Sequence, residues 1–199
     1  MPPLHAGHGG AESSYDELPG TVQVRAMMRR KPHIRSFPPI GAPDAALLIL
    51  GSMPGRASLL ANQYYAHPRN AFWPIMGELF GAGPDIPYAR RVRVLKHAGI
   101  AVWDVLASCT RGSSLDADID EESIVPNDFA PFFRAHPRVQ RVFFNGAKAE
   151  ASFRRYVLRG LAATTLHLER LPSTSPANAS WSQARKLRAW RVLGANAGV

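Results

Sequence analysis

From about residue 43 onward, two patterns of apolar positions alternate along the chain. Short apolar runs, typical of buried strands, cover 45–52, 100–106, 139–146 and the stretch from 164 to about 170. Between and after them, apolar residues recur at helical spacing over 71–81, 87–99, 127–137, 147–161 and 181–194. Strands separated by helices require crossover connections, which are typical of a parallel sheet covered on both faces.

The pattern predicts an α/β fold, a three-layer sandwich with a central, mostly parallel four-stranded sheet flanked by helices. We assign it to a single domain over residues 41–199 of the 199-residue chain. Residues 1–40 are rich in Gly, Pro, Ser and charge and show no sustained periodicity, so we expect a mobile basic N-terminal tail. The longest clean apolar run is far shorter than the roughly 20 residues of a membrane span, and the first residues lack a signal peptide's apolar core.

Ligands of open α/β sheets bind beyond the carboxyl ends of the strands, which selects four loops: 52–70, 104–118, 145–148 and 171–179. The first loop contains "GSMPGRASLLANQYYAHPRNAFW". Gly51 and Gly55 permit tight turns, and Tyr64 or Tyr65 offers a flat face for stacking. The Asn70 amide carries a donor and an acceptor for a heterocyclic base, although Asn70 is equally a candidate N-cap of the following helix.

The other loops offer polar groups with two interpretations each. Asp104 is a candidate general base or a structural cap, and Cys109 beside Arg111 fits a structural role better than a nucleophilic one. In "LPSTSPANAS" the hydroxyls of Ser173, Thr174 and Ser175 suit phosphate contacts, whereas Asn178 or Ser180 could cap the last helix.

Charge and composition limit the partners. The net charge is +9 and the pI is near 10.4, which favours a polyanionic partner, and nucleic acid above all. Basic residues cluster over 25–35 and 185–191. A single cysteine excludes an internal disulfide and a Cys-ligated cluster. The sequence has neither HExxH nor a dinucleotide or Walker fingerprint, so we expect no metal and no cofactor.

Five ordered stretches between Leu47 and Trp190 resemble the uracil-DNA glycosylase superfamily: "GSMPG", "QYYAHPRNAFW", the "WDVLASC" region, "FFNG.KA" and "LPSTSPAN". They are most similar to its hypoxanthine-DNA glycosylase branch, also called family 6. Two positions depart from most of the superfamily. Met53 stands where an Asp or Asn usually positions water, and Leu171 stands where a His or Asn usually supports the departing uracil.

The resemblance implies a monofunctional DNA glycosylase that flips a deaminated base out of DNA and hydrolyses its N-glycosidic bond. Asn70 is implied to position the water, and Tyr65 to stack on the base. The expected base pocket comprises Gly51, Ser52, Met53, Tyr65, Asp104, Asn145 and Gly146, and the expected DNA contacts come from Ser173, Thr174, Ser175, Pro176, Asn178 and Arg185.

We expect the excised base to be hypoxanthine, released from deoxyinosine. The alternatives are removal of uracil arising from cytosine, and a non-catalytic basic nucleic-acid-binding module. We expect a cytoplasmic, nucleoid-associated monomer whose partner is DNA containing a deaminated base, with no membrane partner. Its work would begin base excision repair.

Overall fold

The structure is a computed structural model that describes residues 31–161 and 165–196. The chain divides into two units, residues 1–31 and 32–199. All of the helices and strands named below belong to the second unit. The tail was predicted over residues 1–40, and its first thirty residues lie outside the described residues.

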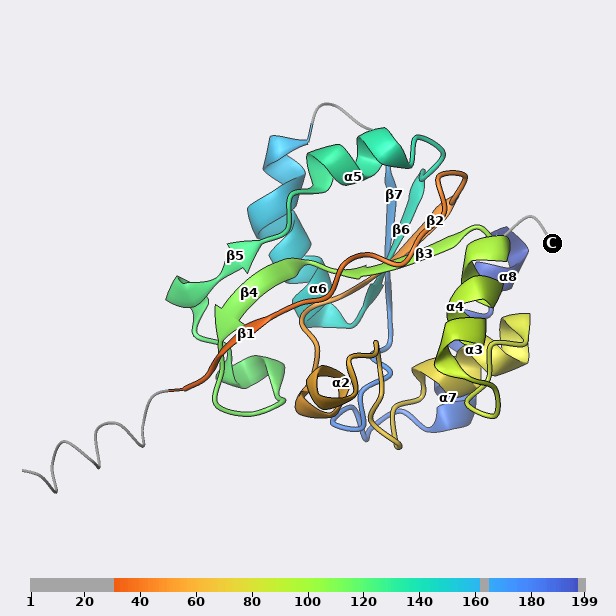
Figure 1. The fold of residues 1–199 in the computed structure, drawn as a ribbon, viewed down its shortest axis with the longest axis horizontal. Coiled ribbons are helices and arrows are strands. Elements are labelled where there is room, and N and C mark those ends of the chain that lie inside the picture. The colour runs from red at the N-terminus through yellow and green to blue at the C-terminus, as the bar shows by residue number, and fades with distance from the viewer. Residues whose placement is uncertain (1–30, 162–164, 197–199) are drawn as a thin grey trace, which may run out of the picture. The chain divides into compact units, whose positions relative to one another are not determined.

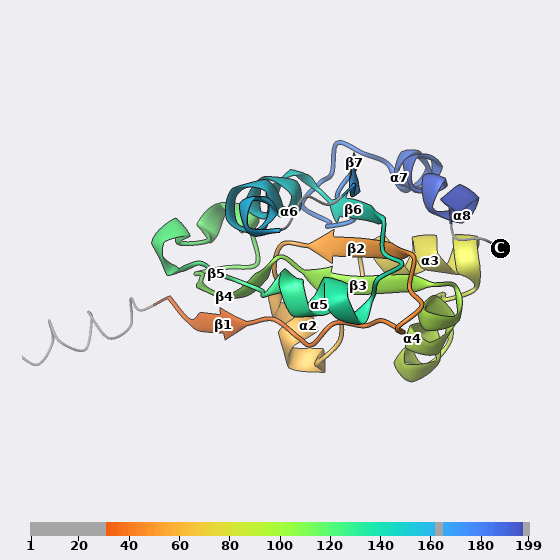
Figure 2. The ribbon, with the colours of Figure 1, turned by 90° about the horizontal axis from the view of Figure 1, so that it is seen from above.

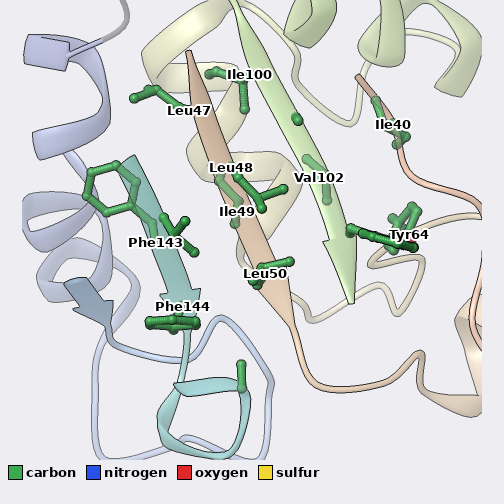
Figure 3. Close-up of a cluster of buried hydrophobic side chains, with 14 of the residues drawn as sticks. Ile40, Leu47, Leu48, Ile49, Leu50, Tyr64, Ile100, Val102, Phe143 and Phe144 are labelled. Carbon is green, nitrogen blue, oxygen red and sulfur yellow. The ribbon is translucent and has the colours of Figure 1, made fainter. Parts of the chain in front are cut away.

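A four-stranded parallel sheet forms the centre of the domain, as the apolar runs predicted (Figure 1). Its strands are β2 (Leu47–Gly51), β3 (Ile100–Asp104), β6 (Arg141–Asn145) and β7 (His167–Leu171), in the order β3-β2-β6-β7. All five β2 residues are buried, and Figure 3 shows its side chains lying between Val102 of β3 and Phe143 of β6. Continuous apolar strands of this kind are typical of parallel sheets covered on both faces.

The strand register brings polar residues together at one edge of the sheet. Gly51 is paired with Asp104, and Asn145 is paired with Leu171. Because β2 has β3 on one side and β6 on the other, the chain changes direction around β2. The carboxyl ends at such a switch point form a crevice for ligands.

Helices lie on both sides of this sheet (Figures 1 and 2). One side carries α3 (Phe72–Phe80), α4 (Tyr88–His97), α7 (Gln183–Trp190) and α8 (Val192–Asn196), and the other carries α5 (Phe129–Ala135) and α6 (Ala147–Ser152). Helix α6 continues as a π-helical turn over Phe153–Val157 and a 3-10 turn over Leu158–Gly160. Gly81 ends α3 in the left-handed conformation that glycine adopts without strain.

A second, antiparallel sheet lies beside the main one, and the hydrophobic pattern did not predict it. It has the order β1-β4-β5, formed by His33–Arg35, Leu106–Thr110 and Val125–Pro126. Beyond β1, Ile40 bridges to Val102 of the main sheet. Residues 33–40 therefore pack as part of the domain, which differs from the predicted boundary at residue 41.

Local structure also differs from prediction at the loops. A short helix, α2 (Arg56–Ala61), and 3-10 turns at Asp116–Asp118 and Glu121–Ser123 lie within regions expected to be irregular or left unassigned. Helix α5 is capped by Asp128, whose side chain accepts from the Ala130 N–H. Within the described residues, no helix is long and apolar enough to cross a membrane.

Candidate active site

A cavity of about 480 Å³ opens at the carboxyl edge of the main sheet. Its volume is in the range of small-molecule sites. The residues that line it come from the ends of β2, β3 and β6 and from the first, second and last predicted loops. They include most of the predicted site: Gly51, Ser52, Met53, Tyr65, Asn70, Asp104, Asn145, Ser173, Thr174, Ser175, Pro176 and Asn178. Gly146 and Arg185 do not line it.

Residue 51 must be glycine because the side chains of Asp104 and Tyr65 lie very close to its Cα atom. A Cβ atom at this position would lie 2.4 Å from Asp104 Oδ1 and 2.9 Å from the Tyr65 hydroxyl. Both separations are shorter than van der Waals contact allows, so a side chain here would push Asp104 or Tyr65 away. The glycine therefore lets an acidic and an aromatic side chain meet beside the end of β2.

The carboxyl group of Asp104 has a pKa near neutral pH. Asp104 is buried, and burial raises the pKa of its carboxyl group from 3.8 to about 7. The Ser36 hydroxyl donates to its Oδ2 at 2.6 Å and opposes that rise. The Asp116 carboxylate adds to the rise, while the Arg111 cation opposes it. Asp104 can therefore donate or accept a proton in the physiological range.

Arg111 lies buried beneath the turn after β2. Its Nη2 donates to the Pro54 carbonyl oxygen at 2.5 Å, whereas its Nε and Nη1 have no hydrogen-bond partner among the described residues. A buried guanidinium makes the neighbourhood of the turn electropositive. The Ser52 hydroxyl, on the same turn, donates to Asp116 Oδ1 at 2.7 Å.

Tyr65 supplies an aromatic wall. Its ring stacks on Phe72 with centroids 4.0 Å apart, and Phe72 is itself packed edge-on against Trp73 and Trp190. Its hydroxyl oxygen is buried without a hydrogen bond of good geometry, although Asn145 lies close enough to oppose the rise that burial causes in the pKa of Tyr65. Tyr65 also has a left-handed φ of +54°, which is uncommon outside glycine.

Asn70 lies two residues before α3, and the N-cap position is Ala71 and not Asn70 as one of its two interpretations had it. The Asn70 side chain nevertheless caps the helix by accepting from the N–H of its first residue. Its Oδ1 accepts from the Phe72 N–H at 2.9 Å. Its Nδ2 has no hydrogen-bond partner among the described residues, which leaves that amide group available to a ligand in the cavity. The cap therefore fixes the orientation of the side chain.

Thr174 connects the end of β6 with the segment that leads into α3. Its N–H donates to Asn145 Oδ1 and its hydroxyl oxygen accepts from Asn145 Nδ2, both at 2.8 Å. Its carbonyl oxygen accepts from the Ala71 N–H at 3.0 Å. Because Thr174 is fully buried, it is a structural link between β6 and α3, and it cannot contact phosphate directly.

Gly146 does not line the cavity expected for it, whereas Arg185, which was predicted to contact DNA, has an exposed position that leaves that prediction open. Gly146 has a φ of +101°, and a Cβ atom there would lie 2.9 Å from Ser173 Cβ, so it permits the last loop to approach β6. Arg185 is exposed on α7, where its guanidinium lies 4.5 Å from the Trp181 ring centroid. The N-cap of α7 is Ser182, and neither Asn178 nor Ser180 serves it.

Sequence reasoning missed three polar residues near the cavity. Ser36 lay in the predicted tail, Arg111 was considered only as a neighbour of Cys109, and Lys186 was counted as an ordinary member of a basic helix. No local pattern marks an arginine or a lysine as buried, because both are usually exposed. Burial of these two cations follows from tertiary packing.

The fold and the site together define a class of protein: an α/β domain with an aromatic and amide-lined pocket at the carboxyl ends of its parallel strands. Residues 38–194, more than half of the chain, match the family model described as the uracil DNA glycosylase superfamily.

Two similar proteins come from Methanosarcina species. A hypoxanthine DNA glycosylase of Methanosarcina acetivorans is 36% identical over 153 residues, which cover 76% of this chain and 92% of the relative. A protein of the same name from Methanosarcina barkeri is 37% identical over 116 residues, or 58% of this chain and 72% of the relative. A solution NMR structure from Methanosarcina acetivorans, described as a candidate uracil DNA glycosylase, superposes with a TM-score of 0.68 at 33% identity and covers 82% of this chain and 98% of that one.

The chain belongs to the uracil-DNA glycosylase superfamily. It is a DNA glycosylase, and its partner is DNA. The resemblance identified from the five sequence stretches is confirmed, as is the three-layer α/β fold.

The raised pKa of Asp104 predicts how stability changes with pH. Between about pH 4 and pH 7 the folded protein keeps a proton on Asp104 that the unfolded chain has lost, so this group lowers the free energy of unfolding as pH rises. The slope approaches about 1.4 kcal/mol per pH unit. Urea unfolding of the wild type and of Asp104→Asn at several pH values measures it. We expect the stability difference between them to change across this window and to level off above it.

Ser36→Ala provides a control for that experiment. Removing the hydroxyl that stabilises the carboxylate should move the upper end of the window to higher pH. If the wild type and Asp104→Asn show parallel pH profiles, the carboxyl is not perturbed.

The Thr174–Asn145 pair predicts a difference between two substitutions. Thr174→Val keeps the shape of the side chain but leaves Asn145 Nδ2 without its partner, which should cost about 1–3 kcal/mol of stability and slow base release. Thr174→Ser keeps both hydrogen bonds and loses a methyl group, at about 1 kcal/mol. Single-turnover assays should show the serine variant close to wild type in rate. A valine variant as fast as wild type would contradict the role given to this link.

Proposed function

We propose that this glycosylase removes hypoxanthine from deoxyinosine in DNA by hydrolysis of the N-glycosidic bond, with Asn70 positioning the attacking water. The observation that carries the proposal is the placement of Asn70 and Tyr65 on the wall of one cavity that also contains a near-neutral carboxyl group. The names of both curated relatives support the choice of base.

The cavity can hold a flipped base by stacking and by hydrogen bonds. Tyr65 is backed by Phe72, so its ring is a rigid surface for a purine. Hypoxanthine offers the N1–H donor and the O6 and N7 acceptors. Asp104 in its protonated form can donate to one of these acceptors as the base becomes negatively charged, and in its ionised form it can accept from N1–H.

The reaction separates the sugar and the base without a covalent enzyme intermediate. The C1′–N9 bond breaks and its electron pair leaves with hypoxanthine, while the water oxygen forms a bond to C1′. Water loses one proton to solvent and the base gains one. The neutral Asn70 amide orients the water and stabilises charge, because an amide is too weak a base to remove its proton.

The identity of residue 53 supports the role proposed for Asn70. Met53 is buried at the turn where most of the superfamily has a water-positioning Asp or Asn, and a thioether cannot orient water. The function would therefore pass to Asn70, which approaches the same cavity from α3. We also propose that the enzyme acts as a monomer on DNA in the cytoplasm, where it would associate with the nucleoid.

A panel of labelled duplexes, each with a single deoxyinosine, deoxyuridine or deoxyxanthosine, tests the choice of base. After incubation with the enzyme, hot alkali cleaves the strand at each abasic site. We expect the fastest strand cleavage at deoxyinosine under single-turnover conditions. Faster cleavage at deoxyuridine would assign the enzyme to uracil removal, and binding without cleavage at any lesion would contradict catalysis.

Two substitutions separate the catalytic amide of Asn70 from its helix cap. Asn70→Ala removes both, whereas Asn70→Ser keeps a capping oxygen for the Phe72 N–H. We expect both variants to release hypoxanthine about 10²–10³-fold more slowly, as is typical when one positioned polar group is lost. Asn70→Ser should unfold at nearly the wild-type urea concentration, and both should bind the duplex. A serine variant with the wild-type rate would move the role to another residue.

A further inference from the structure

A second cavity, of about 300 Å³, adjoins the first. Asn70, Pro176 and Asn178 line both, so the wall between the two cavities is the one that carries the amide of the proposed mechanism. The remaining residues of the second cavity come from the first turns of α3 and α7 and from the segments that lead into these helices, and they include Arg69, Gln183 and Lys186. The proposed reaction gives this cavity no role, although two of its residues, Pro176 and Asn178, were predicted to contact DNA.

Lys186 is the unusual member of this cavity. Lys186 is 5% exposed, and burial lowers the pKa of its ammonium group. An ammonium group has three N–H donors, and within the described residues one of them is used, at 3.2 Å from the Ser175 carbonyl oxygen. None of the ion pairs among the described residues includes Lys186.

A buried cation without a counter-charge is unfavourable unless a ligand supplies the charge. The surroundings of Lys186 suit an anion. The starts of α3 and α7 border the cavity, and the amino ends of helices carry partial positive charge. Arg69, exposed at the rim, adds a second cation. Since the chain is a DNA glycosylase, the anion that would arrive beside a flipped nucleoside is a backbone phosphate.

We propose that Lys186 and Arg69 bind one DNA phosphate in this second cavity, adjacent to the nucleotide whose base enters the first. The phosphate would fix the sugar on the far side of Asn70. Lys186 would also connect phosphate binding to the last loop, because the same ammonium group contacts the Ser175 carbonyl oxygen. This inference depends on DNA as the partner and is independent of which base is removed.

Substitution of single phosphates by neutral methylphosphonates tests the site. The probe is a duplex with a tetrahydrofuran abasic analogue, in which each phosphate near the analogue is replaced in turn. For the wild type, we expect one replacement to weaken binding about 10–100-fold, the usual effect of a charge-assisted hydrogen bond. In Lys186→Met the same replacement should have a clearly smaller effect, because only Arg69 then remains to bind the phosphate. If no position of the backbone shows this coupling, the proposal is wrong.

Salt dependence and a matched variant complete that test. Lys186→Met should reduce the slope of log Kd against log salt by up to about 0.9, the value of one phosphate contact, and by less where Arg69 still neutralises the phosphate. Arg188→Met removes an exposed cation from the same helix and should leave the coupling to the methylphosphonate intact. Hypoxanthine release by the wild type under single-turnover conditions shows separately whether the catalytic proposal holds.

An NMR titration of the wild-type protein tests the same proposal without relying on a variant that could fold poorly. In wild-type protein with ¹³C-labelled lysine, the Lys186 pKa should lie below that of ordinary lysines and should rise when the abasic duplex is added. A lysine that only supports the Ser175 carbonyl would keep the same pKa in the complex. That result would overturn the proposal.

Discussion

The geometry of the site depends on the contact between the Asn145 side chain and the buried Thr174. Two hydrogen bonds of 2.8 Å join the end of β6 to the last loop, and the Thr174 carbonyl oxygen then holds the first residue of α3 through the Ala71 N–H. Since Asn70 immediately precedes Ala71, its position relative to the sheet follows from one threonine. In a site that must place water against a single sugar carbon, small displacements have large effects on rate.

Strands β2, β3 and β6 could be predicted because each contains a short apolar run ending in Gly or a polar residue, whereas β7 has a mixed sequence and ends in Leu171. Parallel strands place their carboxyl ends at one edge of the sheet, and this rule is enough to group Gly51, Asp104 and Asn145. The antiparallel sheet could not be predicted in the same way. Leu106–Thr110 has a mixed composition, and its partner strands are so short that their local sequence carries almost no periodicity.

The environment of each charged residue was the least predictable part of the site. Arg111 and Lys186 have sequence contexts typical of exposed residues, yet both are buried. Asn127 and Asp128 are equally good candidate caps, and the choice between them rests on a tertiary contact. The Asn127 amide donates to the Asp104 carbonyl oxygen, which leaves Asp128 to cap α5. Such choices depend on neighbours that are distant in sequence, so propensity alone does not determine them.

The segment before residue 41 has a consequence for any shortened version of the chain. Phe37 provides carbonyl contacts for Tyr64 and Trp103, and Ser36 reaches the carboxyl group of Asp104. A fragment trimmed at the boundary that the hydrophobic pattern suggests would retain every strand of the main sheet. It would nevertheless lose a hydroxyl that adjusts the acidity of the pocket, so that a soluble, well-folded fragment could differ from the full chain in the pH range over which it works.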